Sequence, residues 1–142
     1  MPAPGTRPLG LELARTARAI GRAFDDALAA ADGTASTWQI LIALKSRQMA
    51  NQRELADAVG IQDATLTHHL NGMESSGLLT RRRDPDNRRI HIVELTRDGE
   101  ALFRRLRAAA VGFDQRLRAG IAAEDLAAFE RVLARLLANV SD

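Results

Sequence analysis

The sequence has 142 residues, no cysteine and a formal net charge of only +2. This length predicts one domain with a core large enough to fold unaided, and the lack of cysteine excludes disulfides, thiolate metal sites and cysteine redox sensing. The N-terminal residues lack an apolar run, and no segment approaches the ~20 apolar residues of a membrane span, so we expect no signal peptide and a cytoplasmic location.

The first third of the chain predicts an arm and two helices. Residues 1–8 hold three of the four prolines, which is typical of a disordered arm. Apolar residues at helical spacing predict a helix from Leu9 to about Ala31. Ser36 and Gln39 read as a capping box that opens a second helix. The side chains expected to face inward from this second helix are Trp38, Leu41, Ile42 and Leu44.

Two short helices joined by a turn come next. Asn51 can cap the first of them, and Glu54 stands where a capping box places a carboxylate. Gly60 allows the backbone conformation of a tight turn. Asp63 or Gln62 can cap the second helix, which is predicted to run to about Ser76. The spacing puts Leu66, His69, Leu70 and Met73 on the inward face. The opposite face carries Gln62, Ala64, Thr65, Thr67, His68 and Asn71, which are short or hydrogen-bonding side chains suited to a major groove.

An arginine-rich hairpin follows directly. Arg81, Arg82 and Arg83 precede the turn sequence Asp-Pro-Asp-Asn, and Arg88 and Arg89 lead into a strand rich in β-branched residues. Nine arginines but only five acids fall between residues 81 and 107. Helix, turn, helix and basic ribbon together are typical of a winged helix-turn-helix. A GC-rich coding bias could explain the overall arginine content, and a solvated charged ribbon could explain the hairpin, but we favour contact with DNA.

Long helices are predicted on both sides of this module. Thr96 caps a helix from Arg97 to about Arg118, with acids in its first turn, and a last helix runs from about Ala123 to Asn139. The inward stripe of the last helix is expected to be Leu126, Phe129, Leu133, Leu136 and Val140. These terminal helices could pack within one chain or on the same helices of a second copy. A two-fold dimer would place two reading helices about one DNA turn apart.

The region from Leu55 to Gly99 resembles the winged-helix core of the MarR family of bacterial transcription regulators. Its most specific features are Asp86-x-Arg88 in the hairpin and Leu95-Thr96-x-x-Gly99 after it. The resemblance implies a mostly α (α+β) fold, with a winged helix-turn-helix at residues 36–96 and dimerisation helices at 9–32 and 97–142. Residues 9–142 would then form a single domain.

The resemblance also implies a function. Such proteins are homodimers that bind palindromic operators in double-stranded DNA, and many are repressors that a small aromatic or phenolic ligand releases. Arg88 would enter the minor groove with Asp86 as its partner, and Gln62, Ala64, Thr65, Thr67 and His68 match the contact positions of the recognition helix. We add Arg82 and Arg89 as DNA contacts. His68 replaces a common arginine and His69 a usual aliphatic residue, so one contact could be weaker and pH-dependent.

A ligand pocket is a further hypothesis. Its lining would be Arg18, Arg22, Trp38, His69 and Met73, although Trp and His at such positions are more often core residues than ligand contacts. A metal site is disfavoured because His68 and His69 diverge by about 100° on a helix and no ligand cluster accompanies them or His91. We expect no cofactor and no enzymatic activity, since phosphate-loop and nucleophile motifs are missing. The alternative function is an architectural or protein-interaction module without an effector.

Overall fold

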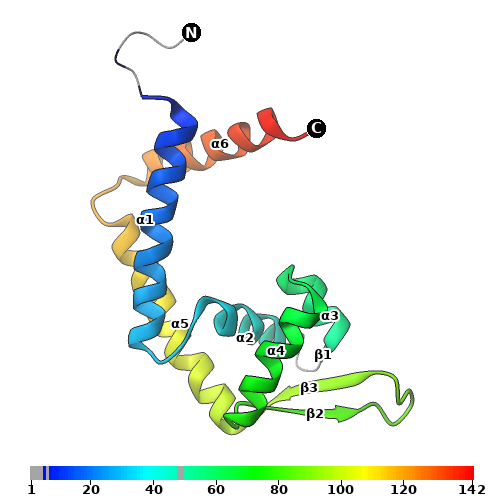
Figure 1. Cartoon of the computed structure of the whole chain (residues 1–142). Coiled ribbons are helices and arrows are strands. Elements are labelled where there is room, and N and C mark those ends of the chain that lie inside the picture. The colour runs from blue at the N-terminus through cyan, green and yellow to red at the C-terminus, as the bar shows by residue number, and fades with distance from the viewer. Residues whose placement is uncertain (1–4, 6, 48–49) are drawn as a thin grey trace. The chain divides into compact units, whose positions relative to one another are not determined.

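The computed structural model describes residues 5, 7–47 and 50–142, so the predicted arm at residues 1–8 lies largely outside the described residues. The described elements are mostly helices, with one small sheet (Figure 1). Their bounds are α1 (Leu9–Ala30), α2 (Ala35–Arg47), β1 (Ala50–Asn51), α3 (Gln52–Val59), α4 (Asp63–Ser75), β2 (Leu79–Arg83), β3 (His91–Leu95), α5 (Arg97–Arg118) and α6 (Ala123–Val140). The predicted winged helix-turn-helix is confirmed.

The helix-turn-helix forms as its local signals predict. The side-chain oxygen of Asn51 accepts the backbone N–H of Glu54 at 2.8 Å, and the Asn51 amide donates to the Glu54 carboxylate at 2.6 Å. Gly60 ends α3 with a φ of +75°, a left-handed conformation that glycine adopts without strain. Gln62 occupies the cap position of α4 but makes no side-chain capping bond. Both helix starts are therefore correctly placed, and only the first is capped by a side chain.

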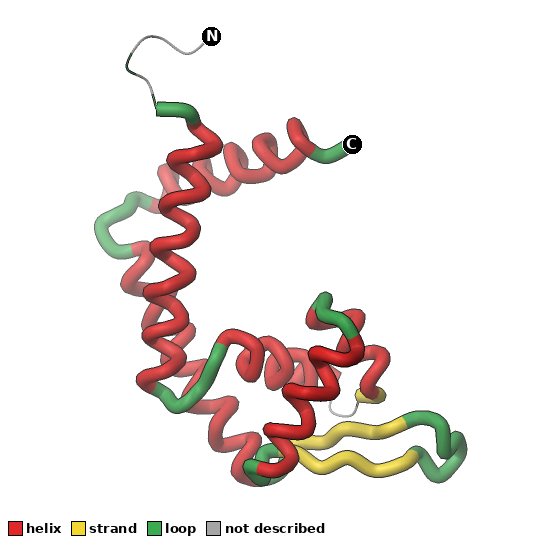
Figure 2. Tube along the Cα trace, viewed as in Figure 1, coloured by secondary structure: helices red, strands yellow, loops and turns green. Residues whose placement is uncertain are grey.

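The sheet has one strand more than the sequence predicts. Its order is β1-β3-β2, and both pairs are antiparallel. The missed strand is β1, which pairs Ala50 with Val93 and Asn51 with Ile92. Two residues are too few to show a period of two in the sequence. Strands β2 and β3 form the predicted hairpin, with its tip drawn as a loop in Figure 2.

One apolar core holds the helix-turn-helix, the hairpin and the start of α5 together. Its fully buried side chains come from every helix between α1 and α5 and from both long strands. They include Leu28, Ile40, Leu41, Leu44, Leu55, Leu66, Leu70, Leu79, Val93 and Leu106. Three of the four inward residues predicted for α4 are buried, and the fourth, His69, is half-buried. The polar face of α4 is thereby left outside.

Two predictions for α2 are wrong. The helix begins at Ala35, and the capping oxygen belongs to Thr34, which accepts the backbone N–H of Thr37 at 3.2 Å, rather than to Ser36. Ile40 is fully buried, whereas Ile42 is 40% exposed. The helix carries five consecutive apolar residues, 40–44, so the sequence does not define which of them face inward.

The start of α5 is fixed to the end of α4. The Thr96 hydroxyl accepts the backbone N–H of Gly99 at 3.1 Å, as predicted for a cap, and also donates to the backbone oxygen of Gly77. Gly77 ends the preceding helix with a φ of +77°. Gly99 is buried, and a Cβ at this position would overlap the backbone oxygen of Leu78. These contacts give the Leu-Thr-x-x-Gly pattern a structural explanation.

The chain divides into two compact units, residues 1–110 and 111–142, with the boundary inside α5. The second unit is a helical hairpin made of the end of α5 and α6, and Gly120 turns the chain between them with a φ of +77°. No residue of this unit is buried. The predicted inward residues Phe129, Leu133 and Val140 are 51%, 38% and 80% exposed. Their apolar stripe is therefore left uncovered by the helical hairpin itself.

Candidate nucleic-acid interface

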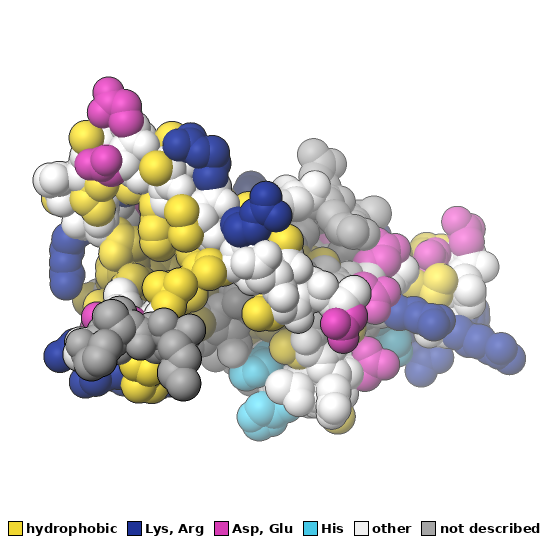
Figure 3. Space-filling view, turned by 90° about the horizontal axis from the view of Figure 1, so that it is seen from above, with side chains coloured by type: hydrophobic (Ala, Val, Ile, Leu, Met, Phe, Trp, Pro, Cys, Tyr) yellow, Lys and Arg dark blue, Asp and Glu magenta, His cyan; other side chains and the backbone are white. Residues whose placement is uncertain are grey.

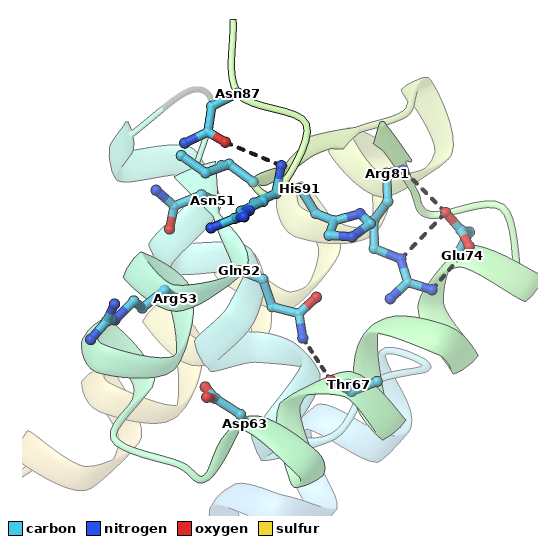
Figure 4. A pocket seen from close by; sticks show the side chains of 11 residues that line it. Asn51, Gln52, Arg53, Asp63, Thr67, Glu74, Arg81, Asn87 and His91 are labelled. Carbon is cyan, nitrogen blue, oxygen red and sulfur yellow. Dashed lines mark hydrogen bonds and ion pairs between the residues drawn. The ribbon is translucent and has the colours of Figure 1, made fainter. Parts of the chain in front are cut away.

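An open groove of about 1160 Å³ lies between the helix-turn-helix and the hairpin (Figure 4). Side chains from β1, α3, α4 and the hairpin line it together. The lining residues are Asn51, Gln52, Arg53, Asp63, Thr67, Glu74, Arg81, Asn87, Arg89, Ile90 and His91. Most of these residues are polar or basic. Helix α4 and the β2–β3 hairpin, which flank the groove, are the elements that the sequence predicts to contact DNA.

The predicted reading residues of α4 are accessible on its outer face. Gln62, Ala64, Thr65 and His68 are exposed, and Thr67 is half-buried. The Gln52 side-chain amide donates to the Thr67 hydroxyl at 2.6 Å, across from α3 to α4. This bond uses Thr67 as an acceptor and leaves its hydroxyl hydrogen available to donate. Sequence reasoning did not identify Gln52.

The hairpin tip is held by its own side chains. The Asp84 carboxylate accepts the backbone N–H of Asp86 at 2.8 Å, which confirms Asp84 as a turn former. The Asn87 side-chain oxygen accepts the backbone N–H of Arg89 at 3.2 Å, and the Asp84 backbone N–H donates to Ile90 O at 2.9 Å. These bonds define the turn. The tip therefore presents its arginines from an ordered loop.

The hairpin arginines differ in their surroundings. Arg82 forms an ion pair with Glu94 at 2.9 Å, so DNA would have to displace or share that carboxylate. Arg83, Arg88 and Arg89 are exposed. Within residues 5, 7–47 and 50–142, no ion pair joins Arg88 to Asp86. The partnership of these two residues stays a prediction.

Arg81 lies on the other side of its strand and binds α4. It pairs with Val93 and shares the face of the buried Leu79, because alternate residues of a strand point the same way. Its guanidinium contacts the Glu74 carboxylate at 3.1 Å and donates to the Asn71 side-chain oxygen. The Arg81 side-chain hydrogen bond lowers the pKa of Glu74, with partial burial opposing it. The two-residue alternation of β2 could have indicated this orientation.

The five residues of the predicted ligand pocket are spread over three helices. Arg18 and Arg22 are exposed on α1, and Met73 is buried. Trp38 stacks on Phe103 with 5.6 Å between the ring centroids. A second groove of about 470 Å³ is lined by Gln39, Ile42, Ala43, Ser46, Ala58 and Val59. None of the five residues lines either of these two grooves, so the pocket also stays a prediction.

The described residues contain no metal-binding cluster and no membrane-spanning helix. In that part of the chain no three His, Asp or Glu side chains are placed to share a metal ion. Nor does any described helix combine the length and apolar character that crossing a bilayer requires.

Part of the chain matches a known protein family, and a longer part is similar to a known regulator. The family model of the MarR family matches residues 34–91, from the start of α2 to the hairpin. An HTH-type transcriptional regulator of Bacillus subtilis (strain 168), YdgJ, is 31% identical over 107 residues, which are 75% of this chain and 65% of that protein, just under two-thirds of its length.

Solved structures extend the likeness to nearly the whole chain. The transcriptional repressor CouR, bound to a 23-mer DNA duplex, is 28% identical, with a TM-score of 0.80 over 92% of each chain. The PcaV regulator of Streptomyces coelicolor, in complex with its natural ligand, is 24% identical, with a TM-score of 0.76 over 98% of this chain and 100% of its own. The PcaV match shows the shared fold alone.

Proposed function

Because this chain belongs to the MarR family, we propose that it is a transcriptional regulator that binds a palindromic operator as a homodimer. The observation that carries this proposal is the groove between α4 and the hairpin. A row of exposed polar side chains on α4 and the exposed Arg83, Arg88 and Arg89 of the hairpin stand beside it. A helix of this kind fits a major groove, and an arginine-tipped hairpin fits the neighbouring minor groove.

Exposed apolar surface supports the homodimer. Of the large apolar side chains that are exposed in the described part of the chain, all except Ile42 lie in α1 or between Val111 and Val140. Apolar side chains also show at the surface on the face drawn in Figure 3. Within α6 alone, Phe129, Val132, Leu133 and Leu137 recur at helical spacing, and monomeric proteins rarely expose large contiguous apolar patches. A second copy offers the same stripes, and a two-fold axis would pair them.

Release by a small molecule is the regulatory part of the proposal. CouR was solved with DNA and PcaV with its natural ligand, so both states of such a cycle occur within this fold. In this chain, Trp38 stacks on Phe103, and Lys45 bonds Glu100 at 2.9 Å, which ties α2 to α5. A ligand that shifts α5 relative to α2 needs a coupling of only about 1–3 kcal/mol to change operator occupancy 5- to 150-fold.

DNA binding is tested by fluorescence anisotropy on the DNA upstream of the protein's own gene. We expect salt-sensitive binding that depends on an inverted repeat. Arg88→Ala should weaken it and make the slope of log K against log salt shallower by about 0.9 if the side chain neutralises one phosphate. Arg105→Ala, at an exposed position of α5, is the matched control and should bind as the wild type does.

The architectural alternative gives a different result in the same assay. Weak binding that ignores sequence, with no effect of scrambling the inverted repeat, would support it. A cytoplasmic location is part of this proposal, because a transcriptional regulator acts where the chromosome lies.

The ligand pocket has a separate test. Aromatic carboxylates and phenols are titrated into the protein–operator complex, and release is compared among the wild type, Trp38→Phe and His69→Leu. We expect both substitutions to raise the ligand concentration needed for release, because both side chains would line the pocket. Unchanged release in both variants would place the effector elsewhere.

A further inference from the structure

Asn71 lies on the outer face of α4 that the sequence predicts to meet a major groove, but it is uncharged and is not one of the predicted DNA contacts. It follows Thr67 by four positions and His68 by three, so its side chain neighbours each of theirs on the helix surface. Asn71 is exposed. It lies eight residues after Asp63, the first residue of α4, which places it about 12 Å further along the axis at ~1.5 Å per residue.

The orientation of the Asn71 amide is fixed by its partner. Its side-chain oxygen accepts from the Arg81 guanidinium. A guanidinium has only donors, so the amide atom facing it must be the oxygen. The –NH₂ group is consequently on the other branch of the amide. No residue in the described ranges accepts a hydrogen bond from it. Asn71 therefore carries two available donors at an exposed position.

Arg81 is itself held and neutralised. Its guanidinium contacts Glu74 at 3.1 Å, and its backbone N–H donates to the same carboxylate at 3.1 Å. Only 19% of the Arg81 side chain is exposed, against 41% of Glu74. Figure 4 shows Arg81 reaching across from β2 to Glu74 on the ribbon of α4. The pair has no net charge, so the donors of Asn71 are presented beside a neutralised guanidinium and not beside a free cation.

We propose that Asn71 binds a DNA phosphate as a neutral hydrogen-bond donor, with Arg81 as the positioning residue behind it. This inference rests on the proposed function. The N-terminal residues of a recognition helix meet base edges, so a residue two turns further on is placed toward the sugar-phosphate backbone. Half or more of protein–DNA hydrogen bonds go to phosphate and sugar, and uncharged amides make many of them. The contact fixes the register of α4 without reading sequence.

The variant Asn71→Asp separates this role from a structural one. The carboxylate keeps an oxygen for Arg81 but replaces the donors with a negative charge directed at the phosphate. We expect about tenfold weaker operator binding, an unchanged melting temperature and an unchanged order of preference among operator sequences. Gln39→Glu makes the same amide-to-acid change at an exposed position of α2 and should leave binding unchanged.

Two further variants complete the test. Asn71→Ala places the best helix-forming residue at an exposed position, so it can replace Asn71→Asp in the test if Asn71→Asp lowers the melting temperature. Its affinity for the operator should fall while the salt dependence of binding stays that of the wild type, in contrast to Arg88→Ala. Arg81→Met should weaken binding in the wild-type chain by more than it does in Asn71→Ala, because its effect passes through the amide.

The outcomes distinguish this inference from the proposed function. A wild-type chain that binds no DNA overturns both. A wild-type chain that binds its operator, with Asn71→Asp equally tight, overturns the role of Asn71 alone. A changed sequence preference in Asn71→Ala would make Asn71 a base reader and overturn the phosphate assignment. Equal effects of Arg81→Met in both backgrounds would remove Arg81 as its positioning residue.

Discussion

Gly99 is the position where one added methyl group should do most damage. A Cβ there would overlap the Leu78 backbone oxygen and lie 3.1 Å from Leu95 Cδ2. Neither neighbour yields easily, because Leu78 O also accepts the Thr96 backbone N–H at 3.0 Å. Overpacking of this kind costs about 1–3 kcal/mol, and the displaced hydrogen bond about 1 kcal/mol more. We therefore expect Gly99→Ala to lower the free energy of unfolding by about 2–4 kcal/mol.

Urea denaturation followed by circular dichroism measures this loss, at one fixed protein concentration because the stability of a dimer depends on concentration. The matched control is Gly72→Ala, in α4, where an added Cβ would meet nothing within 4 Å. That substitution should stabilise the protein by up to about 1 kcal/mol through helix propensity. Equal stabilities of the Gly99→Ala and Gly72→Ala variants would refute the close approach of α5 to Leu78.

Three further predictions concern pH, assembly and capping. Arg81 lowers the pKa of Glu74, so the ionised carboxylate stabilises the fold above the pKa of an unfolded glutamate, about 4.3, and this stabilisation is lost as the pH falls through the lower pKa of the folded state. In urea titrations, Glu74→Gln should be less stable than the wild type at pH 6 but equal to it near pH 2. A difference in stability that stays constant with pH would contradict the assignment. Leu137→Arg, at a side chain 67% exposed, should give a monomer in sedimentation velocity, whereas the control Ile42→Arg, at a side chain 40% exposed, should remain a dimer. If both variants sediment as dimers, α6 is not the dimer interface. Thr96→Val keeps the shape of the cap but removes its oxygen, and should cost about 1 kcal/mol in thermal unfolding, while no loss would mean that the bond to Gly99 is not stabilising.

The sequence was most informative where a single local interaction decides the structure. Asn51 and Glu54 signal their cap by type and spacing, and Gly60 marks a backbone conformation that other residues adopt with strain. The inward face of α4 follows from the helical spacing of Leu66, Leu70 and Met73, which polar residues separate. These features need no knowledge of distant parts of the chain, and the structure confirms them.

The sequence was least informative where distant parts of the chain compete for the same residue. In α2, apolar residues occur all round the helix, so tertiary packing chose Ile40 over Ile42 for the core. In the hairpin, five arginines look equivalent in a list, but Glu94 pairs with Arg82 and Glu74 with Arg81. A cross-strand diagonal places the first pair and an α4–β2 contact the second. Strand alternation indicates that Arg81 points inward, but its partner depends on where α4 packs.

Strand β2 lies at the rim of the sheet, since β3 stands between it and β1. Rim strands can recruit a strand from another molecule and start aggregation. Here the Glu74 carboxylate accepts the backbone N–H of Arg81, and the exposed Arg83 places positive charge on the rim, which disfavours the pairing of two such rims. The basic residues that would grip a nucleic acid therefore also keep unbound molecules from joining through their hairpins. A variant that exchanges them for threonines should precipitate at concentrations where the native chain stays dispersed.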